Sequence, residues 1–327
     1  MSTPAIDTTA ANKSSRGISY WWDRVGIVLV LLLLIVIMGL LAPNFFTVDN
    51  GLNVVRAVSI NAILAAGMTL IILTSGIDLS VGSNLAVAGV VGVLLATAGV
   101  PAFLAVLGGM LAGGIAGFLN GALVAWLALP AFIVTLGSMT YLRGTAYSLL
   151  GGMPLVASDL NYGGIGNGAL AGIPAPVVVM AIVYVAIWFL LERTRFGRHI
   201  YAVGGNIEAA RLAGINTKAV LTWVYTIGGV TAGLAGIIFS ARVLSAQPTA
   251  GTGYELDAIA AVVLGGTSLA GGRGRILGTL VGALIIGVLS NGLVLMNVPF
   301  FYQLIVKGVV IVLAVALDSL KGWGTNK

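Results

Sequence analysis

Residues 102–128 read AFLAVLGGMLAGGIAGFLNGALVAWLA, a run without a single charged side chain. An apolar run of about 20 residues is long enough to cross the hydrocarbon core of a bilayer as a helix. Glycines recur at every fourth position of this run, and residues four apart lie on one face of a helix. Small residues on one face allow membrane helices to pack closely. The run therefore predicts a transmembrane helix whose packing face consists of Gly109, Gly113, Gly117 and Gly121.

The same spacing recurs near the end of the chain, at Gly278 and Gly282. Faces of this kind are common where helices are bundled in a membrane. We interpret both glycine faces as static packing contacts. The alternative is that they form a dimerisation face or a seam along which helices move.

The rest of the chain has a similar composition. Hydrophobic residues make up 59% of its 327 residues and charged residues only 8%, whereas a soluble domain carries about 25% charged residues. Too few polar side chains are present to cover a water-facing surface, so we expect an all-α membrane protein. Hydropathy predicts about ten transmembrane helices, over residues 25–42, 54–73, 80–99, 102–128, 131–150, 175–191, 219–241, 256–270, 276–295 and 301–317.

These spans define a transmembrane domain at residues 25–318, between an amino-terminal tail (1–24) and a carboxy-terminal tail (319–327). We interpret the amino-terminal tail as a retained soluble segment, because no small-residue cleavage site of a signal peptide follows it. The eighth span is short and is interrupted by glycines up to Gly272, which is typical of a partial or re-entrant helix. Nine or eleven spans are the alternatives to ten.

The positive charges indicate the orientation. Loops on the cytoplasmic side of a membrane protein are enriched in Lys and Arg. If both termini are cytoplasmic, the outer segments hold little positive charge beyond Arg56 and Arg242. This pattern explains the net charge of +6 without a nucleic-acid partner. The predicted cytoplasmic segments then contain Lys13, Arg16, Arg24, Arg193, Arg195, Arg198, Arg211, Lys218, Arg273, Arg275, Lys321 and Lys327.

A faint internal repeat is visible. Residues 117–124 read GFLNGALV and residues 287–294 read GVLSNGLV, and each segment is soon followed by a proline and an aromatic residue. The two copies lie five predicted spans apart, so one is inverted relative to the other. Inverted repeats are an architecture of transporters. Chance similarity between two segments rich in Gly, Leu and Val is the alternative explanation.

Several kinds of chemistry are excluded. The chain has no cysteine and a single histidine, His199, so it offers no disulfide framework and no ligand set for a transition metal. It also lacks the Gly-x4-Gly-Lys-Ser/Thr loop that cradles nucleotide phosphates. We expect no cofactor, no bound metal and no catalytic activity. Any ATP that powers the protein must be hydrolysed by another chain.

The longest charged stretch, at residues 192–218, is cytoplasmic by the same charge argument. Asn206 is a good helix N-cap, Glu208 lies in the first turn, and Gly214 is placed to end the helix. A short surface helix is therefore predicted from Ile207 to Ala213. Alanines keep this helix slim, so it could enter a groove on a partner. An ordinary basic loop bound to lipid headgroups is the alternative.

Glu208 to Gly214, with Glu-Ala-Ala, then three residues, then Gly, resembles the EAA loop of ABC importer permeases. Gly76 to Ser83 (GIDLSVGS) and the segment from Ser245 to Gly272 resemble the ribose-type sugar permeases. The resemblance extends from about Leu41 to Asp318. It implies that the following residues couple the chain to an ATPase: Asn206, Glu208, Ala209, Ala210, Arg211 and Gly214.

The resemblance further implies a homodimer in the bacterial inner membrane. Its partners would be ABC ATPase subunits and a periplasmic or lipid-tethered sugar-binding protein, in addition to membrane lipid. The implied fold is similar to that of the ten-helix permeases of the cobalamin-importer type. The implied cargo is a monosaccharide, with ribose favoured over xylose, arabinose or galactose.

Polar and charged residues in or near the spans are costly in lipid and are therefore candidate functional residues. We expect a pathway or a binding-protein contact to involve Asp78, Ser80, Arg143, Glu255, Asp257 and Lys307. For Asp78 and Ser80 the alternative is capping of the third span, and for Glu255 and Asp257 capping of the eighth. Arg143 and Lys307 lie deeper in their spans, which favours inward-facing polar contacts for them.

An ion-coupled secondary transporter of a small polar solute is the alternative function. It would need a carboxylate inside the membrane, and the candidates Asp78, Glu255 and Asp257 all lie at span ends. An importer of a neutral sugar needs only weak polar groups along its path. The polar residues available within spans are Asn61, Thr69, Ser75, Asn84, Asn120, Thr135, Ser138, Ser290 and Asn291.

Overall fold

The computed structural model describes residues 11–324, with the side chains of residues 26–313 and 315–316. The predicted tails at residues 1–24 and 319–327 lie outside the residues whose side chains are described. The first helix begins at Ala11, and the last helix ends at Gly324. The helices are α1 (Ala11–Leu41), α2 (Val48–Leu73), α3 (Val81–Thr97), α4 (Ala102–Trp126), α5 (Ala131–Leu149), α6 (Gly164–Asn167), α7 (Ala175–Arg193), α8 (Arg195–Gly205), α9 (Ile207–Leu212), α10 (Thr217–Val243), α11 (Tyr254–Leu264), α12 (Ile276–Leu295) and α13 (Phe300–Gly324).

The helices have the length and composition of membrane spans. Within the described residues, five are long and apolar enough to cross a bilayer, namely α2, α4, α7, α10 and α12. Nine of the ten predicted hydropathy spans correspond to a helix over most of their length, and the span at residues 256–270 is helical only as far as Leu264. The chain is therefore an all-α membrane protein that crosses the bilayer several times. Shorter apolar stretches cover Gly26–Leu41, Val81–Thr97 and Phe300–Leu313.

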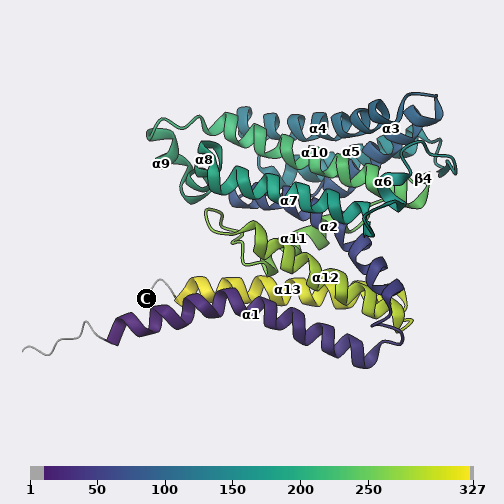
Figure 1. Ribbon diagram of the computed structural model, residues 1–327. Helices are drawn as coiled ribbons and strands as arrows, with labels where there is room; N and C mark the ends of the chain where they lie inside the picture. The colour runs from purple at the N-terminus through teal and green to yellow at the C-terminus, as the bar shows by residue number, and fades with distance from the viewer. Residues whose placement is uncertain (1–10, 325–327) are drawn as a thin grey trace, which may run out of the picture.

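Helix α2 lies at the centre of the bundle. Its side chains from Val58 to Leu73 are almost all buried, and it contacts α7, α10, α11 and α12. A helix that is apolar on every face has no side to present to water. Figure 1 shows α3, α4, α5 and α10 on one side of this core, and α1, α12 and α13 on the other.

The glycine face of α4 packs against α10 of the same chain. A Cβ atom added at Gly113 would lie 2.8 Å from Cα of Gly233, and one added at Gly117 would lie 2.9 Å from Cα of Gly229. The two backbones are thus in direct contact, and a methyl group has no space between them. On α12, Gly282 similarly faces the backbone carbonyl of Ala261 in α11, and Gly278 faces that of Gly265, directly after α11. Both predicted glycine faces pack against other segments of the same chain.

Helix α11 is shorter than the predicted span at residues 256–270. It ends at Leu264, and Gly266 adopts φ +84°, a left-handed conformation that terminates a helix. A helix of 11 residues is about 16 Å long, roughly half the hydrocarbon thickness of a bilayer. The segment from Gly265 to Arg275 continues without helix until α12 begins.

The two copies of the internal repeat lie on helices that run in opposite directions. At the carboxyl end of α4, Trp126 is 5.0 Å from the amino group of Lys218, close to α9. Towards the carboxyl end of α12, Asn291 exchanges hydrogen bonds of 2.9 and 3.1 Å with Asn50, which lies at the start of α2. Figure 1 shows the start of α2 at the opposite end of the bundle from α9.

Short strands and turns close the end of the bundle that lies opposite α9 (Figure 1). Strand β1 (Leu155–Val156) pairs antiparallel with β4 (Ser245–Ala246), in the register Leu155 with Ala246. Strand β2 (Ala169–Leu170) pairs with β3 (Ile173–Pro174). These pairs satisfy backbone groups of the connections that leave α5 and α10.

Candidate functional site

The predicted surface helix is present as α9, at Ile207–Leu212. The side-chain oxygen of Asn206 accepts a hydrogen bond of 2.9 Å from the backbone N–H of Ala209, which caps the helix. Gly214 follows with φ +83°, and the N–H of Ile215 bonds to the carbonyl of Ala210 at 3.0 Å. Capping and termination thus rest on the two residues at which the sequence predicts them.

The outer face of α9 combines an ion pair with exposed apolar side chains. Glu208 and Arg211 lie 2.5 Å apart and both are exposed. Leu212 is 86% exposed and Ile207 is 44% exposed, whereas Ala210 is buried against the bundle. The Leu212 side chain is therefore not packed against this chain. The sequence analysis missed Leu212, although a leucine among small and charged residues is a usable signal.

Helix α8, which the sequence analysis did not separate from the charged loop, attaches α9 to the bundle. One face buries Gly197, Ile200 and Val203, and the other exposes Arg195 and Arg198. The hydroxyl of Tyr201 donates a 3.0 Å hydrogen bond to the carbonyl of Gly274. Burial raises the pKa of Tyr201, so the hydroxyl stays protonated for this bond. The segment that carries α9 is therefore tied to the loop before α12.

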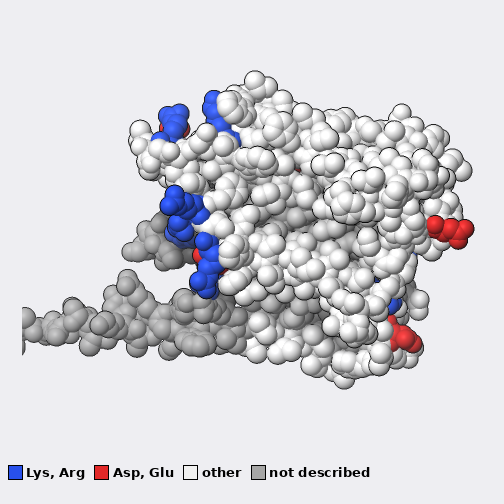
Figure 2. All heavy atoms as spheres, turned by 45° about the horizontal axis from the view of Figure 1, so that its top comes forward, with Lys and Arg blue, Asp and Glu red and all other residues white. Residues whose placement is uncertain are grey.

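Basic side chains gather at the end of the molecule that carries α8 and α9. Figure 2 shows most of the visible Lys and Arg on this end, with some acidic atoms among them, while the opposite end carries acidic side chains and a smaller basic patch. The nitrogen of Lys218 lies over the ring of Trp126, and the guanidinium of Arg193 lies over Trp188. Such positions are typical of the membrane interface on the positively charged side.

Asp78 and Ser80 lie in a buried polar network between α2 and α3. The carboxylate of Asp78 accepts hydrogen bonds from the N–H of Ser80 at 2.7 Å and from its hydroxyl at 2.6 Å. Asn120 of α4 donates to the Ser80 hydroxyl at 2.9 Å, and Ser138 of α5 donates to Asn120. Asp78 is 1% exposed and Ser80 is fully buried. The network links the non-helical segment between α2 and α3 to helices α4 and α5, and Asp78 and Ser80 are buried inside the bundle.

Arg143 and Glu255 both organise the segment that precedes α11. Arg143, on α5, donates from one nitrogen to the carbonyls of Pro248 at 2.5 Å and Ala250 at 2.7 Å. Glu255 accepts a hydrogen bond of 3.2 Å from the N–H of Gly253, as a residue in the first turn of α11 can do. Arg143 thus has the inward-facing polar contact that its depth favours.

Asp257 and Lys307 form an ion pair that the sequence analysis did not foresee. The amino group of Lys307 on α13 lies 2.9 Å from the carboxylate of Asp257 on α11. The Asp257 side chain is only 6% exposed and that of Lys307 is 22% exposed. The pair neutralises two charges that would each be costly within a bilayer.

Most of the polar side chains predicted within the spans form hydrogen bonds inside the bundle. Thr69 and Thr279 share a hydrogen bond of 2.8 Å, and the side chain of Asn84 donates to the carbonyl of Gly113 at 3.1 Å. Helix α5 differs, because it exposes polar groups that the sequence analysis did not single out. The exposed hydroxyl residues are Thr140, Tyr141, Thr145, Tyr147 and Ser148; together with Gly137 and Gly144 they are here called the α5 hydroxyl face, which also borders the exposed apolar side chains of Ile133 and Leu136.

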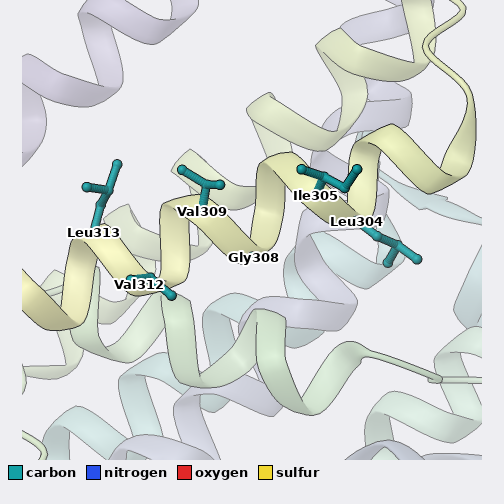
Figure 3. A pocket seen from close by; sticks show the side chains of 6 residues that line it. All are labelled: Leu304, Ile305, Gly308, Val309, Val312 and Leu313. Atoms are coloured by element: carbon teal, nitrogen blue, oxygen red, sulfur yellow. The ribbon is translucent and has the colours of Figure 1, made fainter.

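A hollow on α13 has the opposite character. It surrounds Gly308, and its wall consists of apolar side chains on the outward surface of the helix (Figure 3). Such a surface suits lipid chains or another apolar helix and offers nothing to a hydroxyl-rich sugar. Among the side chains that the structure describes, no three acidic or histidine groups lie together as a metal site would require.

Comparison with known proteins gives consistent matches over nearly the whole chain. The family model of the branched-chain amino acid transport system permease component matches residues 50–315. The ribose import permease protein of Escherichia coli K12 is 53% identical over 298 residues, 90% of this chain and 92% of that protein. The ribose import permease protein of Bacillus subtilis is 48% identical over 91% of this chain and 94% of that protein.

A further relative is the D-allose transport system permease protein of Escherichia coli K12. It is 40% identical over 97% of this chain and 98% of that protein. No solved structure matches the chain.

The ion pair between Asp257 and Lys307 yields a quantitative expectation. Asp257→Asn or Lys307→Met alone should each lower the free energy of unfolding by about 3–5 kcal/mol, because the remaining charge loses its partner. The double variant should recover most of this loss. Thermal unfolding of the detergent-solubilised proteins measures all four states of the cycle. Losses that simply add in the double variant would show that the two residues do not interact.

Proposed function

This chain belongs to the family of branched-chain amino acid transport system permease components, and we propose that its own cargo is a monosaccharide, with ribose the first candidate. It is the permease of a sugar ABC importer and not itself an enzyme. The observation that carries the choice of ribose is the identity of 53% to a ribose import permease. Identity to a D-allose permease is 40% and to an L-arabinose permease 37%.

The bonds made by the three candidate carboxylates argue against ion-coupled secondary transport. Asp78 is bonded to Ser80, Glu255 to the N–H of Gly253, and Asp257 to Lys307. A site that binds and releases a proton or sodium needs a carboxylate accessible to the ion. We therefore infer that energy enters from a separate ATPase.

The proposed orientation places the end with α8 and α9 in the cytoplasm, because the basic residues gather there (Figure 2). α11 begins after β4, at the opposite end, and α12 begins after Arg275 among the basic residues. The short helix and the irregular loop that follows it therefore cross the membrane together. Ten passes result, with both termini cytoplasmic, in a bacterial inner membrane. We further propose that the fold is of the cobalamin-importer type, and this proposal rests on the sequence resemblance alone.

We assign α9 as the element that docks in the ATPase. It projects from the basic end, is braced by α8, and exposes Leu212 and Ile207. A capped helix fixed to two membrane helices can transmit a displacement of its partner into the bundle. The residues that form, cap or end this helix are Asn206, Glu208, Ala209, Ala210, Arg211 and Gly214.

We place the sugar path along the α5 hydroxyl face, between two copies of the chain. The face is exposed and uncharged, and its glycines are open, since a Cβ atom added at Gly137 or Gly144 would meet nothing within 4 Å. Thr140 and Thr145 donate to carbonyls of their own helix. Their oxygens therefore remain free to accept hydrogen bonds from a sugar. One copy leaves this face open, so a second copy is needed to enclose it, while a sugar-binding protein delivers cargo at the opposite end from α9.

The orientation can be tested by labelling, since the chain has no cysteine of its own. Leu170→Cys, at an exposed position of β2, should react with a membrane-impermeant maleimide in intact cells. Arg198→Cys, at an exposed position of α8, should react only after permeabilisation. The reverse result would invert the proposed topology.

The path assignment predicts the effect of a bulky residue on the α5 hydroxyl face. Gly144→Trp should abolish most sugar uptake, because the side chain enters the path, while permease abundance and dimer content in the membrane stay normal. The matched control is Gly308→Trp on the apolar surface of α13, where an added Cβ atom also meets nothing within 4 Å. That variant should transport normally. Undiminished uptake by Gly144→Trp, or loss of its dimer, would contradict a path at this face.

The docking assignment predicts that Gly214→Val and Glu208→Lys reduce uptake and transport-linked ATP hydrolysis together, with less ATPase co-purifying. Valine at φ +83° is strained by about 1–2 kcal/mol, and lysine reverses the charge that pairs with Arg211. Membrane abundance should stay normal, since a Cβ atom at Gly214 meets nothing within 4 Å.

The matched control for this strain is Gly152→Val, at φ +85° in an open position at the other end of the bundle. It should leave ATPase co-purification unchanged. If Gly214→Val and Glu208→Lys behave in the same way as this control, α9 is not the docking element.

A further inference from the structure

We propose that Ser75 is a positioning residue that connects the α8–α9 segment to the non-helical segment between α2 and α3. This inference rests on the proposed docking of an ATPase at α9. Ser75 is the second residue after α2, and its hydroxyl donates to the carbonyl of Ala270 at 2.7 Å. The same hydroxyl lies 3.3 Å from the carbonyl of Gly204, at the end of α8. One side chain thus touches two segments that are distant from it in sequence.

The backbones of these three segments are also in direct contact, here called the glycine junction (Leu73 to Ser75, Gly204 to Gly205, and Ala270 to Gly272). The N–H of Gly272 donates to the carbonyl of Leu73 at 2.9 Å. A Cβ atom added at Gly204 would lie 2.6 Å from the nitrogen of Gly272. One added at Gly272 would lie 2.8 Å from Cα of Gly205. Because no side chains separate the segments, a shift of α8 displaces the other two directly.

The backbone of Ser75 is itself constrained. Its φ of +61° lies in the left-handed region, which a serine seldom adopts. Gly271, at φ +83°, packs against it, and a Cβ atom added at Gly271 would lie 2.9 Å from the nitrogen of Ser75. A residue held in such a conformation is over-determined by its surroundings, as is frequent at switch regions. The hydroxyl bond and the glycine contacts are the forces that hold it.

The segment that follows Ser75 in sequence lies against α5. Two residues later, the carbonyl of Ile77 accepts a hydrogen bond of 3.4 Å from Tyr225 on α10 and lies 3.3 Å from the hydroxyl of Thr135 on α5, whose shorter contact is to Ala131 of its own helix at 2.9 Å. Asp78 follows, with its network to Asn120 and Ser138. The glycine junction therefore joins the α8–α9 segment to the helix that carries the α5 hydroxyl face.

The test is the amount of sugar transported per ATP hydrolysed by the complete transporter in vesicles, with ribose as the probe. Ser75→Gly accepts the left-handed conformation but lacks the hydroxyl. Its transport per ATP should fall roughly 2- to 10-fold, the range expected for the loss of one hydrogen bond. The ATPase should still co-purify, and hydrolysis without sugar should persist.

Two further variants separate positioning from stability. Ser75→Asn also tolerates the left-handed region and keeps a side-chain donor, so it should restore most of the coupling. Ala128→Gly is the matched control, because Ala128 has φ +52° in the exposed turn after α4 and makes no such bond. It should leave transport per ATP unchanged.

Unchanged transport per ATP in Ser75→Gly would overturn the proposal. So would an equal loss in Ala128→Gly or the absence of rescue by Ser75→Asn. If Ser75→Gly is absent from the membrane, Ser75→Ala removes the same donor and gives the same comparison. Failure of the unaltered chain to transport ribose with its ATPase would instead contradict the proposed function, whatever the variants do.

Discussion

The structure depends on one constraint, which is that a backbone polar group inside a bilayer must find its partner within the protein. Helices meet this demand internally, but residues 74–80 and 265–275 are not helical. The two irregular segments meet each other, as in the bond from the hydroxyl of Ser75 to the carbonyl of Ala270. The carboxylate of Asp78 and the hydroxyl of Thr135 satisfy further groups of the first segment. The first irregular segment is therefore largely covered by other helices, whereas the second leaves Gly266, Ala270, Arg273 and Arg275 exposed at the basic end.

Glycine makes this cover possible, because hydrogen bonds between irregular segments require close backbones. On α4 and α10, Gly117 and Gly229 bring two regular helices together. At Gly204 and Gly272 the same small residue brings together the ends of three segments. The first contact extends along a helix and resists displacement, whereas the second is confined to a few residues. A bundle built in this way is rigid along α4 and α10 and has a compact joint beside α8.

Local signals predicted local structure well. Asn206 and Gly214 bracket a helix whose cap and end depend only on neighbouring residues, and the apolar run at residues 102–128 corresponds to α4. The limits are equally physical. Asp257 and Lys307 are 50 residues apart, so only the tertiary fold reveals that they pair. The hydroxyl residues of α5 surround the helix in a pattern that does not show which side the bundle covers, and α11 ends where Gly266 turns.

The distribution of charge explains how such a protein can move a neutral solute. The carboxylates of Asp78 and Asp257 are bonded within the bundle, so neither is free to hold a cargo. In the proposed path, the exposed polar groups of α5 are hydroxyls, which would bind a sugar only weakly. A weak path cannot concentrate a solute, so direction must come from a change in shape driven elsewhere. The helix α9 projects from the basic end with an exposed leucine, and the glycine junction connects it to the interior. The work is therefore done outside the membrane, and the path itself stays permissive.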